Sequence, residues 1–374
     1  MTKHNPENER IKRAYRQHLK AARGLADASI DVATAAIHRF EASIDFRSFK
    51  KFHVEQAIAF RRRLDDAVSA REGKPLSKST ILQTLNALRA FFLWLAEQPG
   101  YRSRIRYSDA EYFRLSEKET RVAKATTSRP VPTPEQIEAV LQRIPCGTVL
   151  ARRNRALIAF TWLTGVRDGA LVSLKLKHVD LDRQLVDQDP REVNTKNSKQ
   201  MRTSFFGVPG SAKQIVTDWI SELVRDHLWG NDDPLFPATR VEVGPDQQFR
   251  AAGIARARWG SAAPVQKIFK QSFEAIGLPG FNPHSIRHAL ALLGEKKCNN
   301  AEEFKAWSQN LGHESVLTTL SSYGAISEER QFEIIREIAD RAGDGAQTAV
   351  LARKVAELLS REMRNTDVLK DAYS

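Results

Sequence analysis

A polar segment closed by three prolines constrains the fold of this chain more than any other feature. It runs from residue 116 to 134 (SEKETRVAKATTSRPVPTP) and has the composition of an inter-domain linker. Thr133-Pro134-Glu135-Gln136 then predicts a helix start, with proline in the first turn and glutamine where a capping box needs it. A chain of 374 residues is long enough for two cores. We therefore expect domains at 1–118 and 135–342, a linker at 119–134 and a tail at 343–374. The amphipathic tail is expected to pack either on a neighbouring protomer or on its own core.

Apolar residues recur at helical spacing through the first domain. The clearest pattern follows Ser77 or Ser79 as a helix cap, with apolar positions at Ile81, Leu85, Leu88, Phe92 and Leu95. Weaker patterns of the same kind cover 11–24, 31–42 and 54–70. The first domain is therefore expected to be helical throughout.

The second domain mixes helical and strand patterns. Helices are expected at 152–164, ended by Gly165, at 211–228, from Pro283 onward, at 327–342 and at 349–363. Residues 179–187 and 191–206 alternate like strands, with a turn at Asn197-Ser198. The expected fold class is mainly α, with a small β-sheet in the C-terminal domain.

The charge of the chain points to a polyanionic partner. The formal net charge is +13, and residues 1–125 hold 25 Lys and Arg against 15 Asp and Glu. Nucleic acid and an acidic membrane surface are the two partners that such a surface attracts. The densest apolar run, at 90–96, is far too short to span a bilayer. Cys146 and Cys298 follow no metal-ligand spacing, so we expect a cytoplasmic protein without a membrane or metal partner.

Six residues of the second domain form a set that suits chemistry on a phosphodiester. They are Arg167 in TGVRDGA, Lys196 in NTKNSK, His284 and Arg287 in PHSIRHA, His313 in LGHES, and Tyr323 in TTLSSYG. The set contains hydrogen-bond donors, cations and a single nucleophile, and no carboxylate. Such a mixture can hold negative charge while a side-chain oxygen attacks phosphorus.

The local context of these residues supports a shared site. His284 and Arg287 are three apart on an expected helix and so emerge on one face. Arg167 follows the helix end at Gly165, where a cation can point into a pocket. Lys196 lies at or beside a hairpin tip, and Lys199 is the alternative for the same role.

In this order, the six residues resemble the active-site series of the tyrosine recombinase (phage integrase) family. TGVRDGALVSLKLKHVDL resembles that family's first arginine box, PHSIRHALA its His-x-x-Arg box, and LGHESVLTTLSSYG its histidine-to-tyrosine box. The resemblance covers roughly 150–325, and the basic helical N-terminal domain matches the family's core-binding domain in kind. Two positions depart from the pattern: Ala170 replaces a usual acidic residue, and Tyr323 follows His313 by one residue more than usual.

The resemblance implies a site-specific recombinase or integrase, for a mobile genetic element, that acts on double-stranded DNA. It implies a helical core-binding domain, a mixed α/β catalytic domain, and a homo-tetramer assembled on DNA. It also implies that Tyr323 forms a 3′-phosphotyrosyl bond without metal or another cofactor.

The resemblance implies roles for the other five residues too. Arg167 and Arg287 would clamp the non-bridging oxygens, and Lys196 would protonate the leaving 5′-oxygen. His284 and His313 would assist, with His284 as a base toward the tyrosine proton.

Two other readings stay open at this point. One is a DNA-binding protein that has the same fold and no chemistry, favoured by Ala170 and by the tyrosine spacing. The other is an enzyme that resembles a type IB topoisomerase. The sequence has no GxxxxGK[ST] motif, carboxylate cluster or His/Cys set, which argues against an ATPase, a two-metal nuclease and zinc chemistry.

Overall fold

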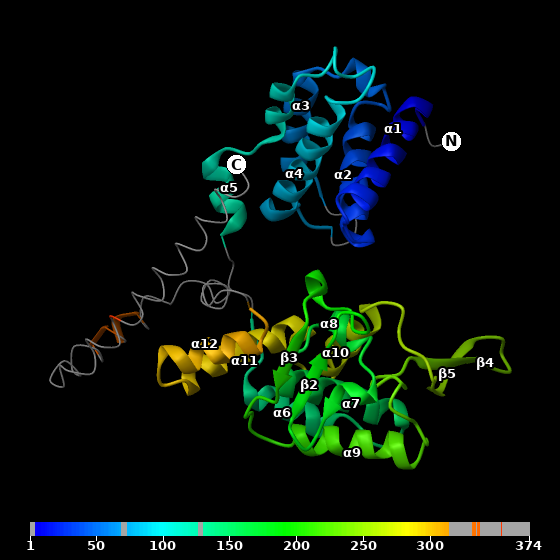
Figure 1. Ribbon diagram of the computed structural model, residues 1–374, viewed down its shortest axis with the longest axis vertical. Coiled ribbons are helices and arrows are strands. Elements are labelled where there is room, and N and C mark those ends of the chain that lie inside the picture. The colour runs from blue at the N-terminus through cyan, green and yellow to red at the C-terminus, as the bar shows by residue number, and fades with distance from the viewer. Residues whose placement is uncertain are drawn as a thin grey trace. The chain divides into compact units, whose positions relative to one another are not determined.

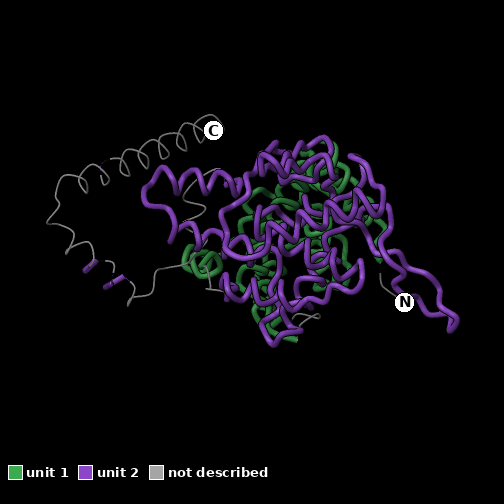
Figure 2. The backbone as a smooth tube through the Cα atoms, turned by 90° about the horizontal axis from the view of Figure 1, so that it is seen from below, with its two compact units in different colours: residues 1–125 green, residues 126–374 purple. Residues whose placement is uncertain are grey.

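The computed structural model describes residues 4–68, 73–125, 130–313, 331–333, 335, 336 and 353. The chain divides into two compact units, residues 1–125 and 126–374 (Figure 2). The division falls inside the segment expected as a linker at 119–134, whose first residues belong to helix α5 (Glu117–Lys124). Tyr323 and the helices expected at 327–342 and 349–363 fall in parts of the chain that are not described, wholly or nearly so.

The first unit consists of helices, as the sequence predicted. They are α1 (Pro6–Gln17), a π turn (His18–Ala22), α2 (Asp27–Ser43), a 3₁₀ turn (Phe49–Lys51), α3 (Val54–Asp65), α4 (Lys78–Leu95), a 3₁₀ segment (Tyr107–Phe113) and α5. The apolar stripe of α4 forms the centre of the core, where Leu85, Leu88 and Phe92 are fully buried. The predicted cap is present, because Ser77 accepts a hydrogen bond from the Thr80 amide.

The second unit is built around one buried helix (Figure 1). Its helical elements are α6 (Pro134–Arg143), α7 (Val149–Thr164), α8 (Asp168–Leu171), 3₁₀ turns at Leu176–His178 and Lys196–Ser198, α9 (Ala212–Arg225), α10 (Ala263–Glu274), α11 (Pro283–Lys297) and α12 (Ala301–Asn310). Helix α7 packs against α6, α9 and α11, and its residues 156–164 are all buried. The predicted capping box at Thr133 and Gln136 is confirmed.

Two small antiparallel sheets complete the second unit. Strands β1 (Val179–Asp180), β2 (Leu185–Gln188) and β3 (Met201–Ser204) form the first, and β4 (Thr239–Val243) and β5 (Phe249–Ile254) form a separate hairpin. The expected fold class, mainly α with a small sheet, is confirmed. The hairpin, α10 and α12 were not predicted.

The strand expected at 191–206 is wrong over residues 191–200. The chain turns after Pro190 instead, because the amides of Glu192 and Val193 both donate to the Asp189 carbonyl. Asn197 and Ser198 take left-handed backbone angles, with φ of 59° and 51°, which confirms the predicted turn and ends any regular strand there.

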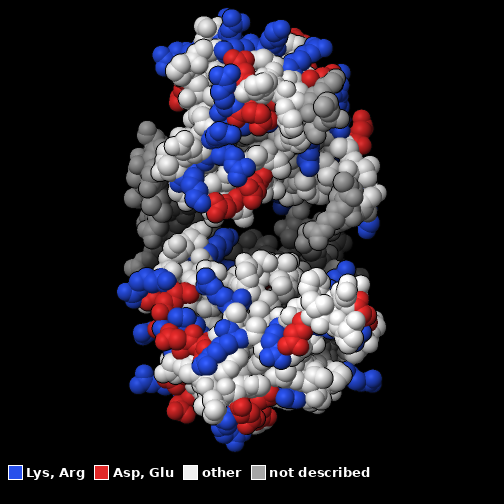
Figure 3. Space-filling model, turned by 90° about the vertical axis from the view of Figure 1, so that its right-hand side faces the viewer, with Lys and Arg blue, Asp and Glu red and all other residues white. Residues whose placement is uncertain are grey.

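Charged side chains are mixed over the surface. On the face in Figure 3, Lys and Arg are interspersed with Asp and Glu on both units. Charge alone therefore does not mark a binding site on this face. Within the described ranges, the helices are too short or too polar to cross a membrane.

Candidate functional site

The turn after α7 positions Arg167. Gly165 ends the helix with φ of 59°, and a Cβ there would lie 2.8 Å from a methyl group of Leu311 and 3.0 Å from one of Leu290. Glycine therefore allows the end of α7 to lie against α11 and the end of α12. Arg167 follows as the residue before α8.

Arg287 is buried at the meeting point of three helices. Its side chain is only 5% exposed, and its guanidinium donates to the carbonyl oxygens of Gly165 and Leu311. The same guanidinium lies 3.5 Å from Nε2 of His313. Sequence spacing placed Arg287 on one helix face with His284, but it gave no sign of this burial. Arg287 thus connects α11 to the ends of α7 and α12.

Arg167 lies close to the residue that precedes His313. Its Nη2 lies 3.5 Å from the carbonyl oxygen of Gly312, and its Nη1 lies 4.0 Å from the sulfur of Met201 on β3. Gly312 has φ of 72°, so the chain turns sharply just before His313. The structure therefore brings Arg167, Arg287 and His313 together.

Two histidines stand next to these arginines on α11. Nε2 of His284 lies 3.1 Å from Nε2 of His288, one helical turn further on. Desolvation is the largest cause that lowers the pKa of His284 to about 4, followed by the charges of His288, Arg287 and Arg167. Sequence reasoning missed His288, although its i+4 spacing from His284 on an expected helix was a usable signal.

His313 is held neutral for the same reasons. Desolvation is the largest cause that lowers the pKa of His313 to about 4, followed by the charges of Arg287 and Arg167. Both imidazoles are therefore uncharged at neutral pH. A neutral imidazole can accept a proton at one nitrogen while it donates a hydrogen bond from the other.

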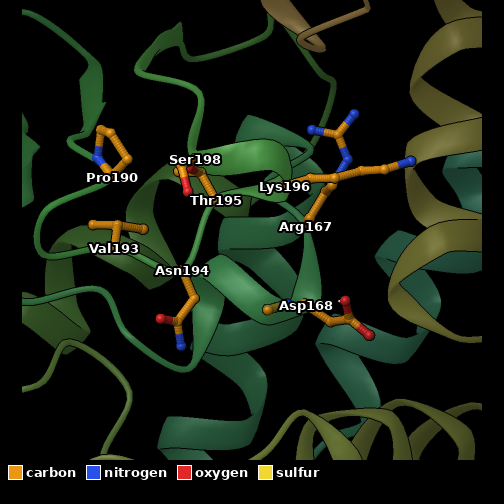
Figure 4. Close-up of a pocket in the computed structure, with 9 residues that line it drawn as sticks. Arg167, Asp168, Pro190, Val193, Asn194, Thr195, Lys196 and Ser198 are labelled. Carbon is orange, nitrogen blue, oxygen red and sulfur yellow. Dashed lines mark hydrogen bonds between the residues drawn. The ribbon is translucent and has the colours of Figure 1, made fainter. Parts of the chain in front are cut away.

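Lys196 lines a pocket together with Arg167. The pocket has a volume of about 440 Å³, and its lining residues are Arg167, Asp168, Gly169, Pro190, Val193, Asn194, Thr195, Lys196 and Ser198. Figure 4 shows the two cations on one side of it, with Pro190 and Val193 on the other. Of the two lysines that the sequence left open, Lys196 is the one in this lining.

A set of ion pairs anchors the loop that carries Lys196. The carboxylate of Glu192 lies 2.8 Å from Nζ of Lys177 and 2.9 Å from Nε2 of the buried His178. The Lys175 amide donates to Nδ1 of His178, so Nε2 of that ring carries the proton toward Glu192. The sequence gave no signal for this anchor, because its members belong to separate turns.

The collected groups can hold a phosphodiester, which is negatively charged, through hydrogen bonds from two guanidiniums and neutral imidazoles. In the described ranges, no three His, Cys, Asp or Glu side chains lie close enough to hold a metal ion. Tyr323, the sixth predicted residue, lies outside these ranges.

The two depressed histidine pKa values predict how stability depends on pH. Their ordinary value is 6.5 and the folded values are about 4, so between these pH values the unfolded chain binds more protons. The free energy of unfolding should therefore rise with pH across this window. Urea unfolding at pH 4.5, 5.5 and 7 measures this free energy. The double variant H284N/H313N should show a weaker rise, and equal pH dependence in both proteins would contradict the prediction.

The fold of this chain is that of tyrosine recombinases and integrases. A lambda integrase (75–356) dimer bound to a COC′ core site matches with a TM-score of 0.58 and 16% identity, over 86% of this chain and 96% of the other. XerH site-specific recombinase bound to a difH substrate matches with a TM-score of 0.55 and 17% identity, over 84% and 82%.

Sequence comparison then gives the family: residues 131–330 match the phage integrase family, and the chain belongs to it. Tyrosine recombinase XerC of Lactobacillus delbrueckii subsp. bulgaricus is 25% identical over 248 residues, which cover 66% of this chain and 72% of the relative. XerC 1 of Ralstonia nicotianae is 23% identical over 286 residues, which cover 75% and 76%. The family and enzyme class predicted from the sequence, a tyrosine-type DNA strand transferase, are thereby confirmed.

Proposed function

We propose that this protein is a site-specific recombinase or integrase of a mobile genetic element, acting in the cytoplasm through a 3′-phosphotyrosine intermediate. The observation that carries the proposal is the convergence of Arg167 with Arg287 and His313, which follow it by more than 100 residues, beside the pocket of Lys196. A cluster of guanidiniums, imidazoles and a lysine can hold the negative charge of a phosphodiester substrate.

In the proposed reaction, the phenolic oxygen of Tyr323 attacks the scissile phosphorus. A phosphorus–oxygen bond to the tyrosine forms, the bond to the 5′-oxygen breaks, and Lys196 gives its proton to that oxygen. A 5′-hydroxyl of a partner strand then reverses the steps. Because the phosphoester bond is conserved in the intermediate, rejoining needs no external energy source.

The neighbouring groups act on the charge and the proton of this step. Arg167 and Arg287 hold the two non-bridging oxygens, whose negative charge grows in the transition state. His284 takes the tyrosine proton, a role that its lowered pKa supports because the ring is neutral at physiological pH. His313, next to Arg287, donates a hydrogen bond to the phosphate.

We infer that the active assembly is a tetramer on two DNA segments. Exchange between two duplexes requires four strand cleavages, and each chain supplies one Tyr323. A related fold, lambda integrase, has been solved as a dimer bound to a core site.

The test uses DNA with a nick beside the scissile position, in a duplex that the protein enriches from a random-sequence pool. After cleavage, the short strand between the scissile position and the nick dissociates and takes with it the 5′-hydroxyl needed for rejoining. An SDS-stable protein–DNA adduct is then expected. Mass spectrometry should map the modification to Tyr323. An inactive DNA-binding protein of this fold would bind without an adduct. A type IB topoisomerase-like enzyme would relax any supercoiled plasmid as a monomer.

The role of Lys196 gives a separate prediction. Lys196→Ala should slow cleavage of ordinary DNA by about 10²-fold or more, the usual range for a general acid. DNA with sulfur at the bridging 5′ position should restore most of the rate, because a thiolate leaves without a proton. The matched control is Lys199→Ala, which should cleave both substrates at the wild-type rate. Equal defects of K196A on both substrates would reject the assignment.

A further inference from the structure

The β4–β5 hairpin presents an apolar face to solvent. Val241 is 55% exposed, Val243 is 62% exposed and Phe249 is 79% exposed. The strand register pairs Val241 with Ala251 and Val243 with Phe249, so all four side chains lie on the same face. The hairpin extends away from the rest of its unit as an arm (Figures 1 and 2).

The opposite face of the arm is charged, but its charges are already paired. Nε of Arg240 lies 3.1 Å from the Glu242 carboxylate, and Nη2 of Arg250 lies 2.8 Å from that of Asp246. Residues 239–254 hold two arginines, one glutamate and one aspartate, so the arm is neutral in a chain of charge +13. A DNA backbone attracts cations that are not neutralised. The arm therefore fits a protein surface better than it fits DNA.

The size of the apolar face limits what the arm can hold. Stable protein interfaces bury about 1,200–2,000 Å², and four side chains of a two-stranded ribbon supply only a small part of that area. Such a contact cannot keep a dimer together in solution. It suits two molecules that DNA already holds next to each other, since their effective concentration is then high.

We propose that the β4–β5 arm docks on a second copy of this chain bound beside it on DNA, with Val241, Val243 and Phe249 as the contact. The proposal rests on the proposed function, because an enzyme that exchanges strands brings several copies to one site. The arm is then the element that makes binding of the second copy cooperative.

Photo-crosslinking identifies the neighbour of the arm. Phe249 is replaced by p-benzoylphenylalanine in the full-length protein, which is irradiated with and without a 60-bp duplex holding two copies of the selected sequence. A crosslinked protein dimer is expected only with DNA. Leu228 is the matched control, because it is also 79% exposed and lies outside the arm, and the same probe there should give no dimer. Crosslinks from position 249 to DNA, or no protein crosslink at all, would overturn the proposal.

Binding measurements test the consequence. The double variant V243S/F249S should bind a duplex with one copy of the sequence as wild type does, while occupancy of the second site on the 60-bp duplex weakens about 10–100-fold. L228S should leave binding to the one-copy duplex and occupancy of the second site unchanged. Equal weakening at one and two sites would reject the arm as a protein contact. A wild-type protein that binds cooperatively but forms no tyrosine adduct would reject the recombinase function and leave the arm standing.

Discussion

Arg287→Ala is expected to slow adduct formation by about 10²–10³-fold, the range measured when one donor to a developing oxyanion is removed. The same substitution should lower the free energy of unfolding. The buried guanidinium donates to the carbonyls of Gly165 and Leu311, and each carbonyl that loses a buried donor costs roughly 1–3 kcal/mol. Single-turnover adduct formation and urea unfolding of the same preparation measure the two effects.

Arg167→Ala is the comparison that separates these effects. The Arg167 guanidinium is 3.5 Å from the Gly312 carbonyl and 4.0 Å from the Met201 sulfur, longer contacts than those of Arg287. Its removal should slow cleavage by a similar factor and change the free energy of unfolding by less than about 1 kcal/mol. R287K keeps the positive charge but loses the planar guanidinium with its paired donors. It should therefore recover little of the cleavage rate or of the free energy of unfolding. Full activity in R287A would remove Arg287 from the site.

The sequence predicted the elements whose signals are local. The apolar stripe that begins at Ile81 became the core of α4, and Gly165 ended α7 in a left-handed conformation, as expected. The order of arginine, lysine and histidine boxes predicted the family. The stripe and the helix end depend on neighbouring residues, and each box is a short segment whose order along the chain is given by the sequence itself.

The contacts inside the site could not be predicted from local sequence patterns. The partners of Arg287 are carbonyls of residues 122 and 24 positions away, and backbone carbonyls have no sequence signature. The loop before Lys196 alternates like a strand, but Glu192 in this loop is anchored by Lys177 and His178, which lie 15 and 14 residues earlier. Helix α10 did carry a readable signal, since Val265, Phe269 and Phe273 recur every four residues and are all fully buried.

The hairpin β4–β5 illustrates a different limit. Val241 and Val243 alternate with charged residues, and Gly244-Pro245-Asp246 is a turn signal, so a strand pair was detectable. Alternation normally indicates that the apolar face is buried in the chain's own core. Here that face is exposed, and only the structure distinguishes a core strand from an arm.

Tyr323→Phe is expected to abolish the adduct, with a loss on the order of 10⁶-fold, as for removal of a catalytic nucleophile in a hydrolase. Phenylalanine keeps the ring and its packing and removes only the attacking oxygen, so binding to the selected duplex should stay within about twofold of wild type. Nicked-substrate trapping measures the adduct, and gel shift measures binding on the same duplex.

The matched control is Tyr373→Phe, because Tyr373 is the one other tyrosine that follows His313 in the sequence. Y373F should form the adduct at the wild-type rate. An adduct that survives in Y323F and disappears in Y373F would move the nucleophile to the C-terminus and discard the ten-residue spacing from His313. An adduct that survives in both would place it upstream of His313, where the arginines would have to hold the phosphate in a different orientation. Loss of the adduct in Y323F alone leaves one arrangement, in which the phenol at 323 reaches a phosphate held by Arg167 and Arg287.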